Sequence, residues 1–125
     1  MLVDTDILIW YMRGNQKAYR AIAKLDDFAI SAVSYMELVQ GMRNKQELNL
    51  LRNFLKNHRV DILHVNEEIS TKALFLVEQY YLSHTLLLAD ALIGATAVIY
   101  GIPLLSGNTR HYKIIKNLIL KQFRP

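Results

Sequence analysis

The chain has 125 residues, no cysteine and a formal net charge of +4, and 52% of its residues are hydrophobic. This length supports one domain over residues 1–125 with a single core. The absence of cysteine excludes a disulfide framework, a thiolate nucleophile and a cysteine-based zinc site. The small basic excess allows a polyanionic partner without requiring one.

Predicted strands and helices alternate along the chain. The sequence pattern predicts strands at residues 1–3, 28–31, 60–65, 103–106 and 118–123. It predicts helices at residues 6–13, 16–25, 34–43, 46–58, 67–81 and 88–100, and a short helix from Asn108. The alternation indicates an α/β fold whose mostly parallel sheet is covered by helices on both faces.

The most apolar segment, residues 86–105, is about long enough to cross a bilayer. It contains Asp90, Gly94, Gly101 and Pro103, so we predict a buried helix followed by a strand, and no membrane association. The first charge comes at position 4, before any long apolar run. We therefore expect no secretory signal and a cytoplasmic location.

Two carboxylates, Asp4 and Asp6, stand where the first predicted strand meets the first predicted helix. In open α/β folds, ligands bind beyond the carboxyl ends of the strands. We predict a functional role for Asp4, because a carboxylate at the end of a central strand is poorly placed as a cap and costly to bury unpaired. Asp6, or Thr5, is predicted to cap the helix, and a role for Asp6 in the site is the alternative.

Glu37 and Asp90 are two further acidic candidates. Ser34 and Glu37 have the spacing of a capping box, so a cap and a functional site are both open for Glu37. Asp90 is the only formal charge between His84 and Arg110. A buried carboxylate needs a counter-charge, a raised pKa or a structural hydrogen bond from a backbone N–H. No Lys or Arg lies near Asp90 in sequence, which favours a functional role.

Three acidic groups that converged from distant segments would repel one another. A hard divalent cation, Mg²⁺ or Mn²⁺, would remove that repulsion, since it binds a few carboxylate oxygens and leaves room for phosphate oxygens. Such a cation can also activate a water for attack on a phosphodiester. Asp4, Glu37 and Asp90 therefore predict a metal-dependent phosphodiesterase.

The segment LLSGNTRHY adds polar groups at the end of the fourth predicted strand. Ser106 is expected to orient a carboxylate. Asn108 is expected to cap the following helix or to hold a metal-bound water or a phosphate. Arg110, His111 and Lys113 form a small basic cluster that would contact substrate phosphates, and solvated surface is the equal alternative. The four histidines are interpreted as surface or capping residues: His58, His64, His84 and His111.

Three blocks in this order, LVDTDILIWYMRGN, ISAVSYMELVQG and ADALIGATAVIYGIPLLSGNTRHY, resemble the PIN-domain family. The resemblance covers essentially the whole chain and is greatest to the VapC-type toxin ribonucleases. It implies a three-layer α/β/α sandwich and Mg²⁺- or Mn²⁺-dependent RNA cleavage. It also implies a homodimer inhibited by a small VapB-like antitoxin, with DNA contacted only through that antitoxin.

By the same resemblance, Asp4, Glu37 and Asp90 match the metal-binding acids of the family. Ser106 matches a position that is usually Thr or Ser. Many relatives carry Asp at position 108, where this chain has Asn108, so a tightly held second metal is not implied. Asp6 matches a position often filled by Asn. Residues expected around the metal ligands, rather than as ligands, are Thr5, Asp6, Ser106 and Asn108.

Two other functions fit parts of the sequence. In a haloacid-dehalogenase-type phosphatase, Asp4 would be the nucleophile and Asp6 the acid. That family needs a later Gly-Asp motif and a partner lysine, which LLLADALIG matches poorly. The second is a catalytically weak binding module that acts only in a complex with its antitoxin.

Overall fold

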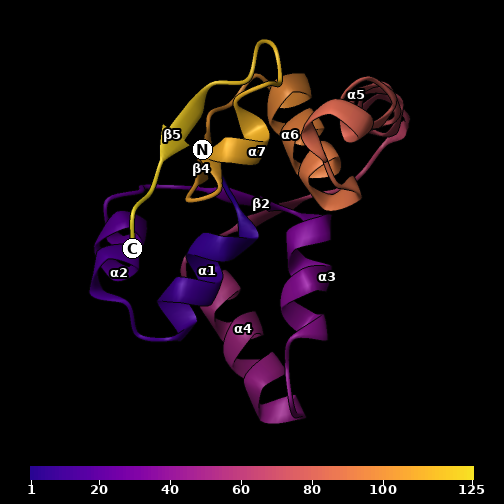
Figure 1. Ribbon diagram of the computed structural model, residues 1–125. Coiled ribbons are helices and arrows are strands. Elements are labelled where there is room, and N and C mark those ends of the chain that lie inside the picture. The colour runs from indigo at the N-terminus through magenta and orange to yellow at the C-terminus, as the bar shows by residue number, and fades with distance from the viewer.

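The computed structural model describes residues 1–125, with a parallel sheet at its centre (Figure 1). The strands are β1 (Leu2–Val3), β2 (Ala29–Ser31), β3 (Asp61–Leu63), β4 (Leu104–Ser106) and β5 (Leu120–Gln122). Their order is β3-β2-β1-β4-β5, and every neighbouring pair is parallel. Because Val3 pairs with Leu105, the residues that follow them, Asp4 and Ser106, come side by side at the carboxyl edge of the sheet.

Seven helices accompany the five strands. They are α1 (Thr5–Met12), α2 (Gln16–Ala23), α3 (Ala32–Gln40), α4 (Lys45–Asn57), α5 (Glu67–His84), α6 (Leu88–Tyr100) and α7 (Thr109–Tyr112). In Figure 1, α1, α2, α3 and α4 lie below the sheet, and α5, α6 and α7 lie above it. The predicted α/β fold and the order of its elements are confirmed, and the sheet is wholly parallel.

The alternation of side chains along the strands divides the core in two. Leu2 and Leu104 point to the face covered by α5 and α6, where they join a buried cluster with Ile93 and Tyr112. Val3, Ile30 and Leu105 point to the opposite face and pack with side chains from the helices α1 to α4. The strands β1, β2 and β4 are therefore buried on both faces, as expected in a three-layer α/β/α sandwich, whereas the edge strands β3 and β5 are partly exposed.

The apolar segment 86–105 forms α6 and β4. No helix in the structure combines the length and the apolar character that a membrane span requires. Gly94 allows α7 and the residues after it to approach α6 closely. A Cβ at Gly94 would lie 2.6 Å from Ile115 Cδ1 and 3.6 Å from Tyr112 Cδ1.

Two predicted helix starts are wrong. Asp4, and neither Thr5 nor Asp6, is the N-cap of α1, and its carboxylate accepts a hydrogen bond from the Thr5 backbone N–H. The helix α3 begins at Ala32 with Ser31 as its cap, so Ser34 lies inside the helix. The proposed capping box of Ser34 and Glu37 therefore does not form. In both cases a polar residue at the end of a strand caps the next helix directly, because no loop separates them.

Candidate active site

Asp4 lies at the carboxyl end of β1, and only 5% of its surface is exposed. Its Oδ1 accepts a hydrogen bond of 2.8 Å from the Thr5 backbone N–H. Its Oδ2 accepts a second hydrogen bond, of 2.7 Å, from Ser106 Oγ at the end of β4. The carboxylate contact expected of Ser106 is therefore present, and it follows from the register of the two central strands.

The environment of Asp4 disfavours its charged form. Burial, followed by the charge of nearby Asp6, raises the pKa of the Asp4 carboxyl from 3.8 to about 7. The hydrogen bonds from Ser106 and Thr5 lower this pKa, because they stabilise the anion, but they do not outweigh burial. A cation bound beside Asp4 would favour the carboxylate, so the position suits a metal ligand.

Asp6, in the first turn of α1, points toward the loop after β4. Its Oδ2 accepts a hydrogen bond of 3.0 Å from the Gly107 backbone N–H, whereas its buried Oδ1 has no partner. Burial and the charge of Asp90 raise the pKa of the Asp6 carboxyl, and the Gly107 hydrogen bond lowers it. An unpartnered buried carboxylate oxygen is rare in folded proteins and fits a cation or an ordered water.

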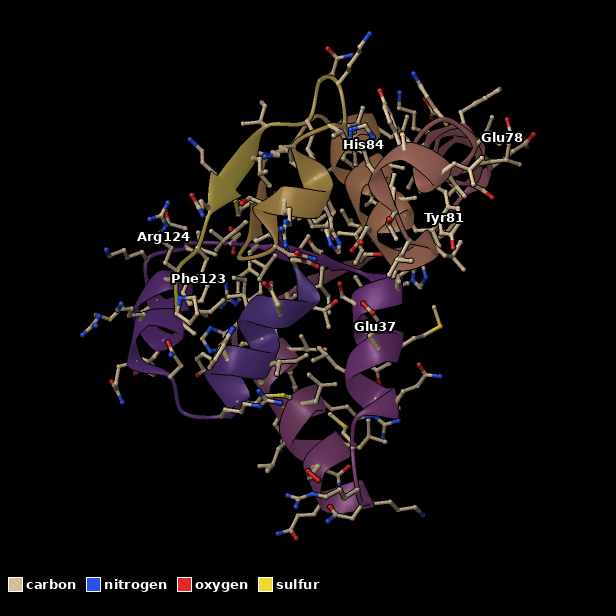
Figure 2. All side chains as sticks on the ribbon, in the orientation of Figure 1. Glu37, Glu78, Tyr81, His84, Phe123 and Arg124 are labelled. Carbon is tan, nitrogen blue, oxygen red and sulfur yellow. The ribbon has the colours of Figure 1, made fainter.

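Glu37 reaches the same edge of the sheet through Thr5. Thr5 Oγ1 donates a hydrogen bond of 2.7 Å to Glu37 Oε1 and lies 2.9 Å from Ser34 Oγ. Figure 2 labels Glu37 on α3, the helix beside α1, and its side chain is exposed. Because Thr5 also donates its backbone N–H to Asp4, one residue connects the carboxylates of Asp4 and Glu37.

Asp90, in the first turn of α6, has a histidine as its partner. Asp90 Oδ2 lies 2.9 Å from His111 Nδ1, and the Asp90 side chain is 14% exposed. His111 Nδ1 also lies 3.3 Å from Asn108 Nδ2. The Asn108 backbone N–H donates a hydrogen bond of 2.9 Å to Ser106 Oγ, while the Asn108 side chain does not cap α7. The partner of Asp90 is therefore neither a Lys, an Arg nor a backbone N–H.

These contacts form one continuous chain of polar groups across the carboxyl edge of the sheet, in which two links use the backbone N–H groups of Thr5 and Asn108. It runs from Glu37 through Thr5 to Asp4, and continues through Ser106, Asn108 and His111 to Asp90. As the side chains stand, no three His, Asp or Glu residues are grouped closely enough to hold a metal ion. The three acids predicted as ligands thus belong to one network without forming a closed coordination shell.

The other predicted residues lie beside this network. Arg110 and Lys113 are exposed on and just after α7, with no carboxylate partner. Sequence reasoning placed His111 in a basic cluster beside the site and missed its contact with Asp90. It also missed Tyr112, which is fully buried near the acids. A sequence signal existed for both: Asp90 needed a partner from outside its own helix, and the segment RHY begins four residues after Ser106, the end of a strand.

The donor atoms of the arrangement are of the type that hard cations prefer. The carboxylates supply oxygen atoms as metal ligands, which Mg²⁺ and Mn²⁺ prefer to the nitrogen and sulfur ligands of zinc sites. The charge of Asp6 raises the pKa of Asp4, and the charge of Asp90 raises the pKa of Asp6, so a ligand that brought positive charge would relieve this repulsion.

Comparison with known proteins gives a consistent family assignment. A family model described as PIN domain matches residues 1–117. Ribonuclease VapC10 of Mycobacterium tuberculosis strain H37Rv is 34% identical over 122 residues, which cover 94% of this chain and 90% of the relative. Ribonuclease VapC1 of Methanocaldococcus jannaschii is 29% identical over 125 residues, with 97% and 85% covered.

Solved structures share the fold. A toxin–antitoxin complex from Klebsiella pneumoniae contains a chain with a TM-score of 0.79 and 28% identity, and 94% of each chain is covered. DNA-bound VapBC from Salmonella typhimurium contains one with a TM-score of 0.82 at 16% identity, covering 97% of this chain and 96% of that one. Since the family model spans nearly the whole chain and VapC10 is similar along its length, this chain belongs to the PIN-domain family.

Proposed function

We propose that residues 1–125 form one metal-dependent endoribonuclease domain, the toxin of a toxin–antitoxin pair that acts on RNA in the cytoplasm. The observation that carries the proposal is the network of Asp4, Glu37 and Asp90 at the carboxyl edge of the sheet. The relatives named as ribonucleases support RNA as the substrate. The toxin–antitoxin complex among the similar structures supports a small antitoxin as the partner.

Asp4, Glu37 and Asp90 would hold the metal ion, Mg²⁺ or Mn²⁺, with Asn108 contributing through a water. The unpartnered Oδ1 of Asp6 and the raised pKa of Asp4 support a cation here, because both are costs that positive charge would offset. When bound, the ion would activate water and neutralise charge on the phosphodiester. Glu37 and Asp90 would exchange their present contacts with Thr5 and His111 for that role.

The chain's own residues have separate tasks in this proposal. Ser106 and the Thr5 backbone N–H fix both oxygens of Asp4, so that its carboxylate is oriented before any ligand arrives. The Gly107 backbone N–H fixes Asp6 in the same way. Arg110 and Lys113, exposed beside the network, would contact RNA phosphates. Pre-oriented carboxylates lose less conformational freedom on binding, which favours both the ion and the transition state.

A groove of about 610 Å³ supports a protein partner. It is lined by residues of α1, α3 and α4 and of the segments that follow α1 and α3. Nine of the fourteen residues are hydrophobic, and Glu37 is among the fourteen. Leu50 in this lining is 65% exposed and Met12 is 49% exposed. A segment of the antitoxin that filled the groove would bury these side chains and end beside Glu37, which would block the site. The similar toxin–antitoxin structure supports that partner, and we propose that the chain itself forms a homodimer.

The proposal is tested by RNA cleavage with purified protein free of its partner. We expect cleavage with Mg²⁺ or Mn²⁺, none with EDTA, and a loss of at least about 100-fold for Asp90→Asn and Glu37→Gln. Glu78→Gln is the matched control, because Glu78 is an exposed carboxylate on α5, away from the network (Figure 2). Equal activity of Asp90→Asn and wild type would refute the metal-site assignment.

The same preparation separates the alternative functions. A phosphatase would hydrolyse p-nitrophenyl phosphate, which we expect to remain intact under conditions where RNA is cut. A binding module without activity of its own would leave RNA intact at every metal concentration. Either result would replace the ribonuclease proposal.

A further inference from the structure

Two buried side-chain polar atoms in the structure have no hydrogen-bond partner, and both belong to the candidate site. One is Asp6 Oδ1 and the other is the hydroxyl oxygen of Tyr112. Buried polar atoms are nearly always paired, so two exceptions at one edge of the sheet need a common explanation. The carboxylate oxygen of Asp6 has no neighbouring cation or hydrogen-bond donor, whereas the phenol of Tyr112 has no acceptor for its proton.

Packing alone does not explain the Tyr112 hydroxyl. The ring is fully buried in the core cluster with Leu104 and Ile115, and Gly94 leaves room for it beside α6. A phenylalanine ring would fill the same space. Burying a hydroxyl without a partner is unfavourable, so the oxygen destabilises the folded protein unless it acquires an acceptor.

The acids are the acceptors within reach. Burial raises the pKa of the Tyr112 phenol, and the charges of Asp4 and Asp90 and a donor contact toward Asp4 raise it further. The same contact lowers the pKa of Asp4, as a hydrogen-bond donor does. No acceptor completes a full hydrogen bond with the hydroxyl as the side chains now stand. The phenol is therefore close to Asp4 without being fully bonded to it.

Asp4 has room for one more donor. An ionised carboxylate offers about four lone-pair sites on its two oxygens. The Thr5 backbone N–H and Ser106 Oγ occupy one site on each oxygen. Of the two sites that remain, one would serve a cation and the other would accept from Tyr112.

We propose that Tyr112 is a positioning residue of the metal site, whose hydroxyl donates to Asp4 when a cation is held there and so fixes the orientation of that carboxylate. The inference rests on the proposed metal site and goes beyond it by assigning a task to a core residue. Outer hydrogen-bond partners of metal ligands commonly change metal affinity by 10–100-fold. We expect the Tyr112 hydroxyl to contribute about 10-fold.

The test compares Tyr112→Phe with wild type in Mn²⁺ binding, measured from the electron paramagnetic resonance signal of free Mn²⁺. We expect the dissociation constant of the variant to rise about 10-fold. Tyr80→Phe is the matched control, because it removes a hydroxyl from a ring that packs against the same core cluster but lies on α5. Its dissociation constant should equal that of wild type.

A second measurement excludes a purely structural effect. In EDTA, we expect the melting temperature of Tyr112→Phe to equal or exceed that of wild type, because the variant removes an unpartnered buried group. RNA cleavage by the variant should be reduced at low Mn²⁺ and restored at high Mn²⁺, which a misfolded site would not show.

The outcomes separate the inference from the proposed function. Equal Mn²⁺ affinity of Tyr112→Phe and wild type would overturn the role of Tyr112 and leave the metal site intact. A lower melting temperature of the variant in EDTA would also overturn it, because the hydroxyl would then be satisfied without metal. Absence of Mn²⁺ binding by wild type would instead overturn the proposed metal site, and the inference with it.

Discussion

Ser106 Oγ donates a hydrogen bond of 2.7 Å to Asp4 Oδ2, and the two residues are 102 positions apart in the chain. The contact joins the ends of the two central strands, β1 and β4, whose parallel register brings these residues together. It gives the buried carboxylate a fixed orientation, yet it leaves the pKa of Asp4 at about 7. Three experiments follow from the way this edge of the sheet is built.

The stability of the metal-free protein should fall as pH rises from about 4 to about 7. Asp4 has a folded-state pKa of about 7 against 3.8 as its ordinary value, so the folded state binds more protons in this window. The contribution of Asp4 to the free energy of unfolding should therefore be greatest at low pH. It should decrease by up to about 4 kcal/mol as the pH rises and Asp4 becomes ionised. Urea denaturation in EDTA at several pH values measures it.

Asp4→Asn is the comparison for that experiment, because it removes the titrating group and keeps a side chain of similar size. The variant should show a clearly shallower decrease over the same window, with the part that remains due largely to Asp6, whose pKa is also raised. Parallel pH profiles for the two proteins would contradict the assignment of the effect to Asp4.

Mn²⁺ should raise the melting temperature of wild type more than that of Asp4→Asn. A ligand that binds only the folded state stabilises it according to its concentration and affinity, and the variant loses one carboxylate of the site. At a Mn²⁺ concentration 100 times the dissociation constant, the gain for wild type is about 2.7 kcal/mol. Thermal denaturation over a Mn²⁺ series measures both proteins, and equal shifts would count against Asp4 as a ligand.

Gly107→Ala should reduce activity because it disturbs Asp6. A Cβ at position 107 would lie 2.8 Å from Asp6 Oδ2 and 3.3 Å from the Phe123 carbonyl oxygen, so the carboxylate has to move. Overpacking of this kind commonly costs about 1–3 kcal/mol. We expect a loss of RNA cleavage of at least about 10-fold, which corresponds to 1.4 kcal/mol of transition-state stabilisation.

The matched control is Gly41→Ala at the end of α3. A Cβ there would lie 3.6 Å from the Leu38 carbonyl oxygen, an ordinary contact, and the backbone of Gly41 is helical with a φ of −84°. This variant should keep both its activity and its stability. If the two alanine variants lost activity alike, the close approach of Gly107 to Asp6 would not be the cause.

Much of the fold follows from local sequence patterns. Buried strands and amphipathic helices have different periodicities, and α6 was predicted with the ends that it has, residues 88–100. The predicted ends of α1 and α3 were less accurate, because Asp4 and Ser31 cap those helices while their own backbone is still extended. A residue that ends a strand and also caps a helix cannot be assigned to one element by periodicity.

The sequence by itself determined which acids stand at strand ends and helix starts, and therefore that Asp4, Glu37 and Asp90 were candidates for one site. Only the tertiary structure decided their partners: Thr5 for Glu37, Ser106 for Asp4 and His111 for Asp90. The physical reason is that these contacts span 32, 102 and 21 positions of the chain. They depend on the strand order β3-β2-β1-β4-β5, which local periodicity does not encode. The same holds for Tyr112. The sequence predicts only that its ring is apolar, whereas the tertiary structure brings the carboxylates near its hydroxyl.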